Sequence, residues 1–173
     1  GDSMPALLAL GAEVILASVS ESRTVPLAQF YTGYRTSVLR SDELVKSVRI
    51  PLPGNGTHFQ VYKVTKRADQ DISAVCGAFW ICIEDGIIVA ARVAFGGMAP
   101  MPIRVSACEV SMLGSSIADE PTSASIAALD DALTPITDVR ASDRYRQRVA
   151  VNLLRRFYMQ LNGLPSNGLY ARD

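Results

Sequence analysis

The chain has 173 residues, of which 49% are hydrophobic and 20% are charged, and its 17 basic residues balance 17 acidic ones. This length suits one ordinary domain or two small ones, and the composition lies well away from that of disordered proteins. A net charge of zero gives no sign of the basic surface that binds nucleic acid or an anionic membrane, so we expect neither partner.

The cysteines and the single histidine offer little for disulfide or metal chemistry. Cys76 and Cys82 fall in one predicted strand, which separates them by roughly 20 Å and excludes a disulfide between them. Neither these two nor Cys108 has metal-site spacing such as C-x-x-C, and no nucleophile motif accompanies His58. We therefore expect buried free thiols in a cytoplasmic protein, an exposed histidine, and no metal or iron–sulfur cluster held by this chain.

The N-terminal part predicts a short helix and then strands. Asp2 or Ser3 can cap the helix, Pro5 suits its first turn, and Gly11 suits the position just past its end. The apolar run that contains the helix is cut by Glu13 and follows no basic stretch, so it predicts neither a signal peptide nor a membrane span. The predicted strands are AEVILASV (12–19), TVPL (24–27) and LVKSVRI (44–50).

A stretch rich in proline and glycine then interrupts the pattern. PLPGNGT (51–57) holds two prolines and two glycines, which indicates a linker or a domain boundary. We therefore divide the chain into residues 1–52, a second domain at 53–165 and a tail at 166–173.

After this linker the sequence predicts three antiparallel strands and then three helices. The strands are HFQVYKVT (58–65), SAVCGAFWICI (73–83) and IIVAARVAFGG (87–97), and Asp85-Gly86 predicts a tight hairpin between the last two. The helices are predicted at 104–113, about 122–133 and about 142–161. Thr122 or Ser123 can cap the second helix, and Ser142 or Asp143 the third. Strands followed by helices are typical of an α+β fold.

The loop between the first two of these strands is unusually charged. Five charged residues and a glutamine fall between Lys63 and Asp71. A solvated hairpin turn explains this composition. Lys63, however, stands in the strand itself and shares a face with Phe59 and Val61, which is unusual for a lysine without a partner. Such a lysine can hold a phosphate or a ribose hydroxyl, so the composition leaves both interpretations open.

Two further motifs also allow a structural and a functional interpretation. The pair Gly96-Gly97 is typical of a strand end or bulge, and it also permits close approach of the backbone to a ligand. The run RASDRYRQR (140–148) is typical of a capped, solvated helix start, and its arginines could also dock an acidic partner.

Five stretches together resemble the flavin-binding subunits of molybdenum hydroxylases, of the bacterial xanthine dehydrogenase type. They occur in family order over nearly the whole chain: GDSMPALLALGAEV (1–14), FYTGYRTSVLRSDELVKSVRIP (30–51), YKVTKRADQDISAVCGAF (62–79), RVAFGGMA (92–99) and TDVRASDRYRQRVAVNLLRRFY (137–158).

The resemblance implies a fold and a role in electron transfer. Residues 1–52 would be the end of a vanillyl-alcohol-oxidase-type FAD domain, and 53–165 an α+β domain with a three-to-four-stranded antiparallel sheet packed on three helices. FAD would take electrons from iron–sulfur clusters, fed by a molybdenum cofactor during purine hydroxylation, and pass them to NAD. The partners would be the large subunit that binds the molybdenum cofactor and the iron–sulfur domain of the same subunit.

The resemblance also implies three flavin contacts. Asp2 matches the acidic residue of the family's S-P-I-x-D stretch, Val45 matches the apolar residue before the I-P strand end, and Lys63 matches the lysine that opens the charged loop. No catalytic residue is implied in this chain.

The charged loop itself resembles the segment that lies beside the flavin ring and governs the access of NAD. Asp69, Gln70 and Asp71 would lie near the flavin and along the path of NAD. A charge held there changes both the electronics of the ring and the approach of an anionic dinucleotide.

The family's glycine-rich segment, which cradles the flavin pyrophosphate, has no match in this sequence. We therefore expect a C-terminal fragment of an enzyme subunit that is inactive alone. Two alternatives stay open: a flavoprotein subunit of a related hydroxylase that acts on carbon monoxide or an aromatic substrate, and a non-catalytic subunit-assembly module.

Overall fold

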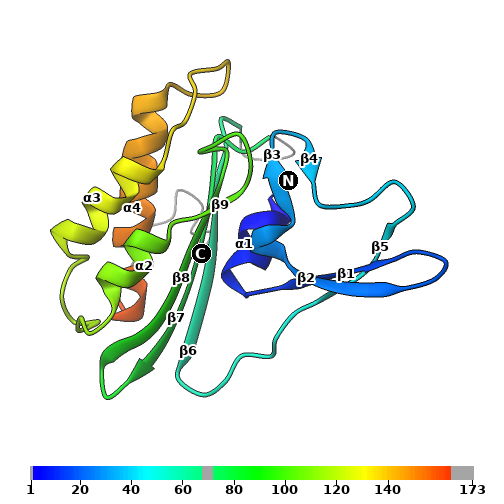
Figure 1. Ribbon diagram of the computed structural model, residues 1–173. Coiled ribbons are helices and arrows are strands. Elements are labelled where there is room, and N and C mark those ends of the chain that lie inside the picture. The colour runs from blue at the N-terminus through cyan, green and yellow to red at the C-terminus, as the bar shows by residue number, and fades with distance from the viewer. Residues whose placement is uncertain (1, 68–71, 165–173) are drawn as a thin grey trace.

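The computed structural model describes residues 2–67 and 72–164, and it confirms the α+β fold. A four-stranded antiparallel sheet in the order β6-β7-β8-β9 stands between two layers: α2, α3 and α4 cover one face, and α1 with the remaining strands lies on the other (Figure 1). The elements in chain order are α1 (Ser3–Ala9), β1 (Glu13–Ala17), β2 (Ser22–Pro26), the 3-10 helix η1 (Leu27–Gln29), β3 (Tyr31–Gly33), β4 (Thr36–Ser37), β5 (Leu44–Arg49), β6 (Thr57–Val64), β7 (Val75–Glu84), β8 (Ile87–Gly96), β9 (Ile103–Arg104), α2 (Ser106–Met112), α3 (Ser123–Ala132) and α4 (Asp143–Leu161).

The two longest strands, β7 and β8, are joined by the predicted hairpin. Asp85 and Gly86 have φ angles of 49° and 80°, and two consecutive positive φ angles are what a two-residue type I′ turn requires. The short strand β9 pairs with the end of β8. Its residues Ile103 and Arg104 are therefore extended, and α2 begins at Ser106 rather than at position 104 as predicted.

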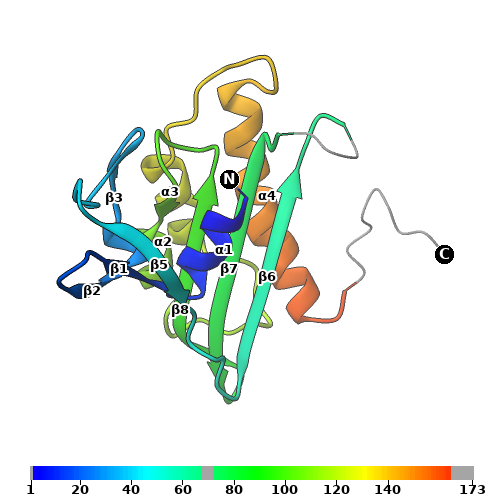
Figure 2. The same ribbon diagram turned by 90° about the vertical axis from the view of Figure 1, so that its right-hand side faces the viewer.

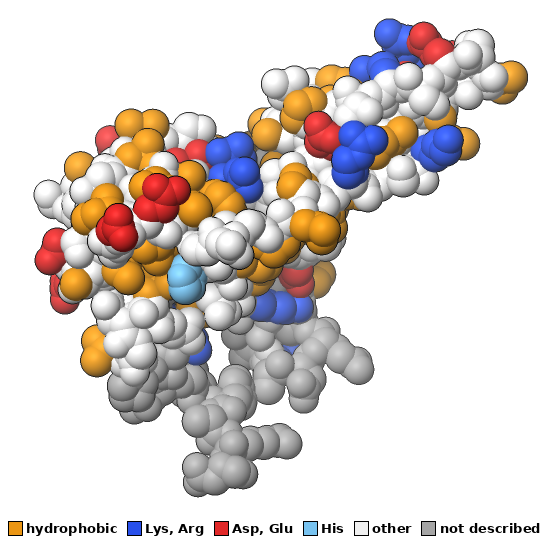
Figure 3. All heavy atoms as spheres, turned by 90° about the horizontal axis from the view of Figure 1, so that it is seen from below, with side chains coloured by type: hydrophobic (Ala, Val, Ile, Leu, Met, Phe, Trp, Pro, Cys, Tyr) orange, Lys and Arg blue, Asp and Glu red, His pale blue; other side chains and the backbone are white. Residues whose placement is uncertain are grey.

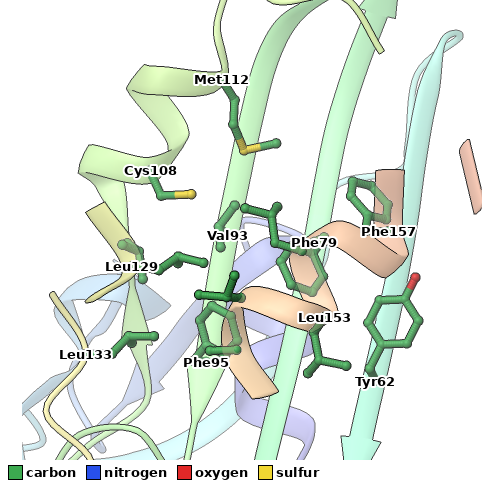
Figure 4. Packing of buried hydrophobic residues seen from close by; sticks show 14 of the residues in the cluster. Tyr62, Phe79, Val93, Phe95, Cys108, Met112, Leu129, Leu133, Leu153 and Phe157 are labelled. Atoms are coloured by element: carbon green, nitrogen blue, oxygen red, sulfur yellow. The ribbon is translucent and has the colours of Figure 1, made fainter. Parts of the chain in front are cut away.

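The larger of two apolar cores lies between the sheet and helices α2–α4 (Figure 4). Phe79 of β7 is fully buried at its centre. Its ring centroid lies 5.7 Å from Phe95 in an edge-on arrangement and 5.3 Å from Phe157 in a stacked one. Aromatic pairs of this kind add about 0.5–1.5 kcal/mol each beyond the free energy of burial. The apolar stripe of the last helix is thus core, as its spacing indicates.

Two predicted caps fix where the long helices begin. The side chains of Thr122 and Ser142 accept hydrogen bonds from the backbone N–H groups of Ser125 and Tyr145, at 3.1 and 3.2 Å. Such caps contribute about 1 kcal/mol each to stability. Among the described residues no helix, α4 included, combines the length and apolarity needed to cross a bilayer.

The second face of the sheet is covered by the N-terminal segment (Figure 2). Ala78 of β7 and Ala94 of β8 are fully buried there and belong to one cluster with Leu8 of α1. A Cβ added to Gly96 would lie 2.9 Å from Cγ of Pro5, so only small residues leave room for α1. The two parts that the linker separates in sequence therefore share a buried surface.

The three-stranded sheet β2-β1-β5 ends in an open edge. All six residues of β5 are exposed, although Leu44, Val45 and Val48 are apolar. In the register of the sheet, Val45 lies opposite Leu16 and Val48 opposite Val14, so both exposed valines share the face of buried β1 residues. This face continues the smaller core outward into solvent.

We predict that a chain beginning at Gly56 still folds, because the larger core is built from residues after the linker. Losing its N-terminal cover exposes Trp80, the single tryptophan, and we expect a melting temperature lower by on the order of 10 °C. Circular dichroism should show one cooperative transition, and the tryptophan emission should move to longer wavelength than in the full chain. A non-cooperative melt would show that residues 1–52 complete the fold.

The domain boundary between residues 52 and 53 and the tail at 166–173 stay predictions, and the tail lies outside the described residues.

Candidate functional site

Two of the three residues with a predicted role in flavin binding meet at the start of α1. The Oδ2 atom of Asp2 lies 2.8 Å from Nζ of Lys63, and Oδ1 accepts a hydrogen bond of 2.6 Å from Oγ of Ser73. Hydrogen bonds from Lys63 and Ser73 hold the pKa of Asp2 below its ordinary value. The carboxylate of Asp2 is thus ionised at neutral pH. Asp2, a predicted helix cap, makes no capping bond to α1 with its side chain.

The alternation of β6 explains where Lys63 points. Tyr62 is buried in the core beneath the helices, so Lys63 emerges on the opposite face together with Phe59. This is the face that α1 covers (Figure 2), and Asp2 is the residue that precedes that helix. The lysine that lacked a partner in the sequence therefore has one, supplied by a residue 61 positions earlier.

The Asp2–Lys63 pair remains open to solvent. Each side chain keeps 44% of its exposure. Exposed ion pairs contribute little to stability, roughly 0–1 kcal/mol. The pair is therefore better suited to meeting a ligand than to holding the fold, because nearly half of each side chain remains exposed.

Cys76 lies beneath this pair but is not suited to act as a nucleophile. Its Sγ donates a weak hydrogen bond to the backbone oxygen of Asp2 at 3.6 Å. Burial, reinforced by the carboxylate of Asp2, raises the pKa of the Cys76 thiol to about 11. The thiol is thus protonated at neutral pH. All three cysteines are free; Cys76 and Cys108 are buried as predicted, whereas Cys82 is half-buried.

The third predicted contact, Val45, lies elsewhere. It belongs to the edge strand β5 of the three-stranded sheet, whereas Lys63 belongs to β6 of the four-stranded one. Its side chain is exposed and can offer an apolar surface. The structure brings Asp2 and Lys63 together and leaves Val45 in a separate element.

The charged loop is tied at its base. The N–H of Ala74 donates to the carbonyl of Val64 at 2.8 Å, and Nζ of Lys66 donates to the carbonyl of Val139 at 3.3 Å. The two ends of the loop are thus bonded to each other, and its start is bonded to the turn that precedes α4. The three residues predicted to lie near the flavin and the path of NAD, Asp69, Gln70 and Asp71, fall outside the described residues.

A pocket of about 490 Å³ opens beside Ser73. Tyr34, which is exposed at the β3–β4 turn, lines it together with Arg140 and Ile136. No sequence motif drew attention to Tyr34 or Ser73, because both derive their interest from neighbours far away in the chain.

One wall of the pocket contains a buried arginine that sequence reasoning assigned to the surface. Arg146 keeps only 3% of its exposure and pairs with Oδ1 of Asp138 at 2.7 Å. The backbone N–H of Arg140 and the guanidinium of Arg146 hold the pKa of Asp138 well below its ordinary value. The helix start is capped by Ser142 as predicted, but Arg146 points inward and cannot dock an acidic partner.

The remaining candidates have structural explanations. Gly96 ends β8, and Gly97 follows it with a φ of 78°, so this pair is a strand end packed against other parts of the same chain. His58 is exposed on β6, as predicted (Figure 3). Within the ranges 2–67 and 72–164, no three His, Cys, Asp or Glu side chains are grouped to hold a metal ion.

The chain is similar in sequence and in structure to known hydroxylases and dehydrogenases. A nicotinate hydroxylase and a xanthine dehydrogenase, both of Emericella nidulans, are 31% and 28% identical over 93% and 91% of this chain, which spans 12% of each. A solved carbon monoxide dehydrogenase of Hydrogenophaga pseudoflava, described as lacking the Mo-pyranopterin moiety of its cofactor, has a TM-score of 0.82 and 25% identity over 88% of this chain and 53% of its own.

Two family matches cover most of the sequence. Residues 1–53 match the FAD binding domain in molybdopterin dehydrogenase, and residues 60–161 match the CO dehydrogenase flavoprotein C-terminal domain. The chain therefore belongs to the flavoprotein part of the molybdenum hydroxylase family.

Proposed function

We propose that this chain helps to bind FAD in a molybdenum hydroxylase of the xanthine dehydrogenase type, with Asp2 and Lys63 as the residues that hold the flavin nucleotide. The observation that carries the proposal is the open ion pair at 2.8 Å between them. It lies where the segment matched by the FAD domain packs on the sheet of the second domain.

The chemistry of the pair fits FAD. A flavin nucleotide carries hydroxyl groups, phosphates, ring carbonyls and a ring N–H. The ammonium group of Lys63 can donate to the oxygens, and the carboxylate of Asp2 can accept from hydroxyl or N–H groups. Val45 would supply an apolar contact from β5. When bound, FAD supplies the coupling between the single electrons of iron–sulfur clusters and a two-electron acceptor.

We further propose NAD as that acceptor, with the pocket beside Ser73 as its approach. Together Arg140, Arg146 and Asp138 leave the lining with one net positive charge, which favours an anionic dinucleotide, and Tyr34 offers an exposed aromatic surface. Asp69, Gln70 and Asp71 would lie along the same path. The iron–sulfur clusters and the molybdenum cofactor would belong to partner domains and subunits.

Two alternatives remain compatible with the family. The substrate would be chosen at a molybdenum site outside this chain, so carbon monoxide or an aromatic compound could replace a purine. A subunit-assembly role is favoured by the exposed apolar residues of β5. Measuring FAD binding by the intact flavoprotein separates an assembly module from a flavin-binding subunit, because only the latter quenches flavin fluorescence.

We predict that the 173-residue chain alone does not retain FAD. The sequence contains no glycine-rich pyrophosphate cradle, and such phosphate contacts supply much of the affinity for a dinucleotide. The purified chain should be colourless, without visible flavin absorbance. Stoichiometric yellow protein would mean that Asp2, Lys63 and their neighbours suffice.

In the intact flavoprotein, Lys63→Ala should weaken FAD binding by about 10- to 100-fold, since a charge-assisted hydrogen bond is worth roughly 1.5–3 kcal/mol. Equilibrium titration of the apoprotein with FAD measures the change. Arg148→Ala, which removes a positive charge from the exposed side of α4, is the matched control and should leave the affinity within about twofold. Equal affinities of wild type and Lys63→Ala would contradict the proposed role.

Gln70→Glu should raise the KM for NAD while the melting temperature changes little, because a negative charge on the path repels an anionic dinucleotide. Electron flow to a small artificial acceptor should be less affected. Gln60→Glu introduces the same charge on the exposed surface of β6 and serves as control. Unchanged NAD kinetics in Gln70→Glu would leave the loop as an ordinary hairpin turn.

A further inference from the structure

The buried guanidinium of Arg146 lies where three separate parts of the chain meet. Its Nη1 donates to the backbone carbonyls of Ala74 at 2.5 Å and of Gly97 at 2.9 Å, and its Nη2 donates to Oδ1 of Asp138 at 2.7 Å. A buried charge is costly unless it is paired and hydrogen-bonded. Here the charge is paired with Asp138, and two of the hydrogen bonds join the start of β7 to the end of β8.

Ala74, whose carbonyl accepts from Arg146, lies at the end of the charged loop. Ala74 donates its N–H to Val64 at 2.8 Å and gives its carbonyl to Arg146, so both of its backbone polar groups are bonded. Ala74 itself is buried. Its position is therefore set from two sides, by β6 and by α4.

The hydrogen bonds from Arg146 to the carbonyls of Ala74 and Gly97 form a bridge between the two strands. The shape of the neighbouring backbone leaves space for this bridge. Gly97 has a φ of 78°, and a Cβ there would lie 2.8 Å from the carbonyl oxygen of Ala74 and 3.3 Å from Nη1 of Arg146. Any side chain would push the guanidinium away from one of its acceptors. Glycine at this position is thus part of the same arrangement.

The bridge leads directly to the open ion pair. Ser73 precedes Ala74 and donates its hydroxyl to Oδ1 of Asp2 at 2.6 Å, while Oδ2 of Asp2 pairs with Lys63. The carboxylate of Asp2 is therefore oriented by one residue of β6 and by one residue whose backbone is fixed next to Arg146. If Ala74 shifts, Ser73 shifts with it.

We propose that Arg146 is a positioning residue for the flavin site: it fixes Ala74, which holds Ser73 against Asp2 and so orients the carboxylate that pairs with Lys63. The inference rests on the proposed flavin site, but the hydrogen bonds of Arg146 go to Ala74, Gly97 and Asp138 rather than to the pair itself. It assigns a role in cofactor binding to a residue of the helical layer, on the far side of the sheet from α1 (Figures 1 and 2).

Arg146→Gln and Arg146→Lys test this role by two measurements. Amide hydrogen exchange on the 173-residue chain reports the bridge without any cofactor, and FAD titration of the intact flavoprotein reports its consequence. We expect Arg146→Gln to speed exchange at the Ala74 amide about tenfold and to weaken FAD binding about tenfold. Arg146→Lys, which keeps the charge but not the planar fork, should give smaller changes in the same direction.

Two control variants separate positioning from charge and from general stability. Arg148→Gln removes an exposed charge from the same helix, and Leu154→Ala destabilises the larger core while leaving the bridge intact. In both variants the ratio of the exchange rate of the Ala74 amide to that of the Phe79 amide should stay within about twofold of wild type. The affinity for FAD should also stay within about twofold.

Unchanged Ala74 exchange in Arg146→Gln, unchanged FAD affinity, or an equal loss of affinity in Leu154→Ala would overturn the proposal. If Arg146→Gln does not fold, Gly97→Ala disturbs the bridge from its other side and must produce both changes, or the proposal fails. A failure of the proposed flavin site is distinct, because Lys63→Ala would then leave FAD affinity unchanged whatever the Arg146 variants do.

Discussion

Helix α1 packs on the sheet through side chains too small to hold it away. Ala78 and Ala94 are fully buried beneath it, and Gly96 leaves space that Pro5 occupies. Close approach brings the N-terminal end of the helix to the end of β6, where Asp2 reaches Lys63. Larger residues on this face would raise the helix and separate the two charges. The geometry of the candidate site is thus a consequence of packing, and packing density tolerates little change in volume.

Two ion pairs of opposite character serve the two sides of the sheet. The Asp2–Lys63 pair is exposed to solvent, so water weakens its Coulomb energy. A ligand can therefore replace either partner at low cost. Arg146–Asp138 is shielded, with Arg146 nearly inaccessible, and its loss would leave a buried charge unpaired. The open pair is suited to binding and the shielded pair to fixing the backbone. Ser73 and Ala74, adjacent in sequence, connect one to the other.

Local chemistry accounts for what the sequence predicted correctly. The type I′ turn at Asp85-Gly86 and the caps at Thr122 and Ser142 depend on residues within three positions of each other. The strand-then-helix order follows from periodicity, which also placed Lys63 on the same face as Phe59. Each of these features is encoded within one element.

Long-range packing accounts for what the sequence left open. The partner of Lys63 is Asp2, which lies 61 positions earlier, and nothing near Lys63 in the chain indicates it. Arg146 sits in a run of arginines that is typical of a solvated helix start, yet the carbonyls it binds belong to residues far earlier. Arg104 belongs to the strand β9 rather than to α2, because pairing with β8 outweighs helix propensity. In each case the deciding contact joins two elements.

The way the loop is anchored allows its chemistry to vary independently of the fold. Ala74 and Val64 close its base, and Lys66 ties its first half to the turn before α4. Because these anchors lie outside positions 68–71, side chains at those positions can change without removing an anchor. Binding specificity is commonly carried by such loops on a rigid scaffold. A change of charge at Asp69, Gln70 or Asp71 would therefore leave these hydrogen bonds and the pair Asp2–Lys63 in place.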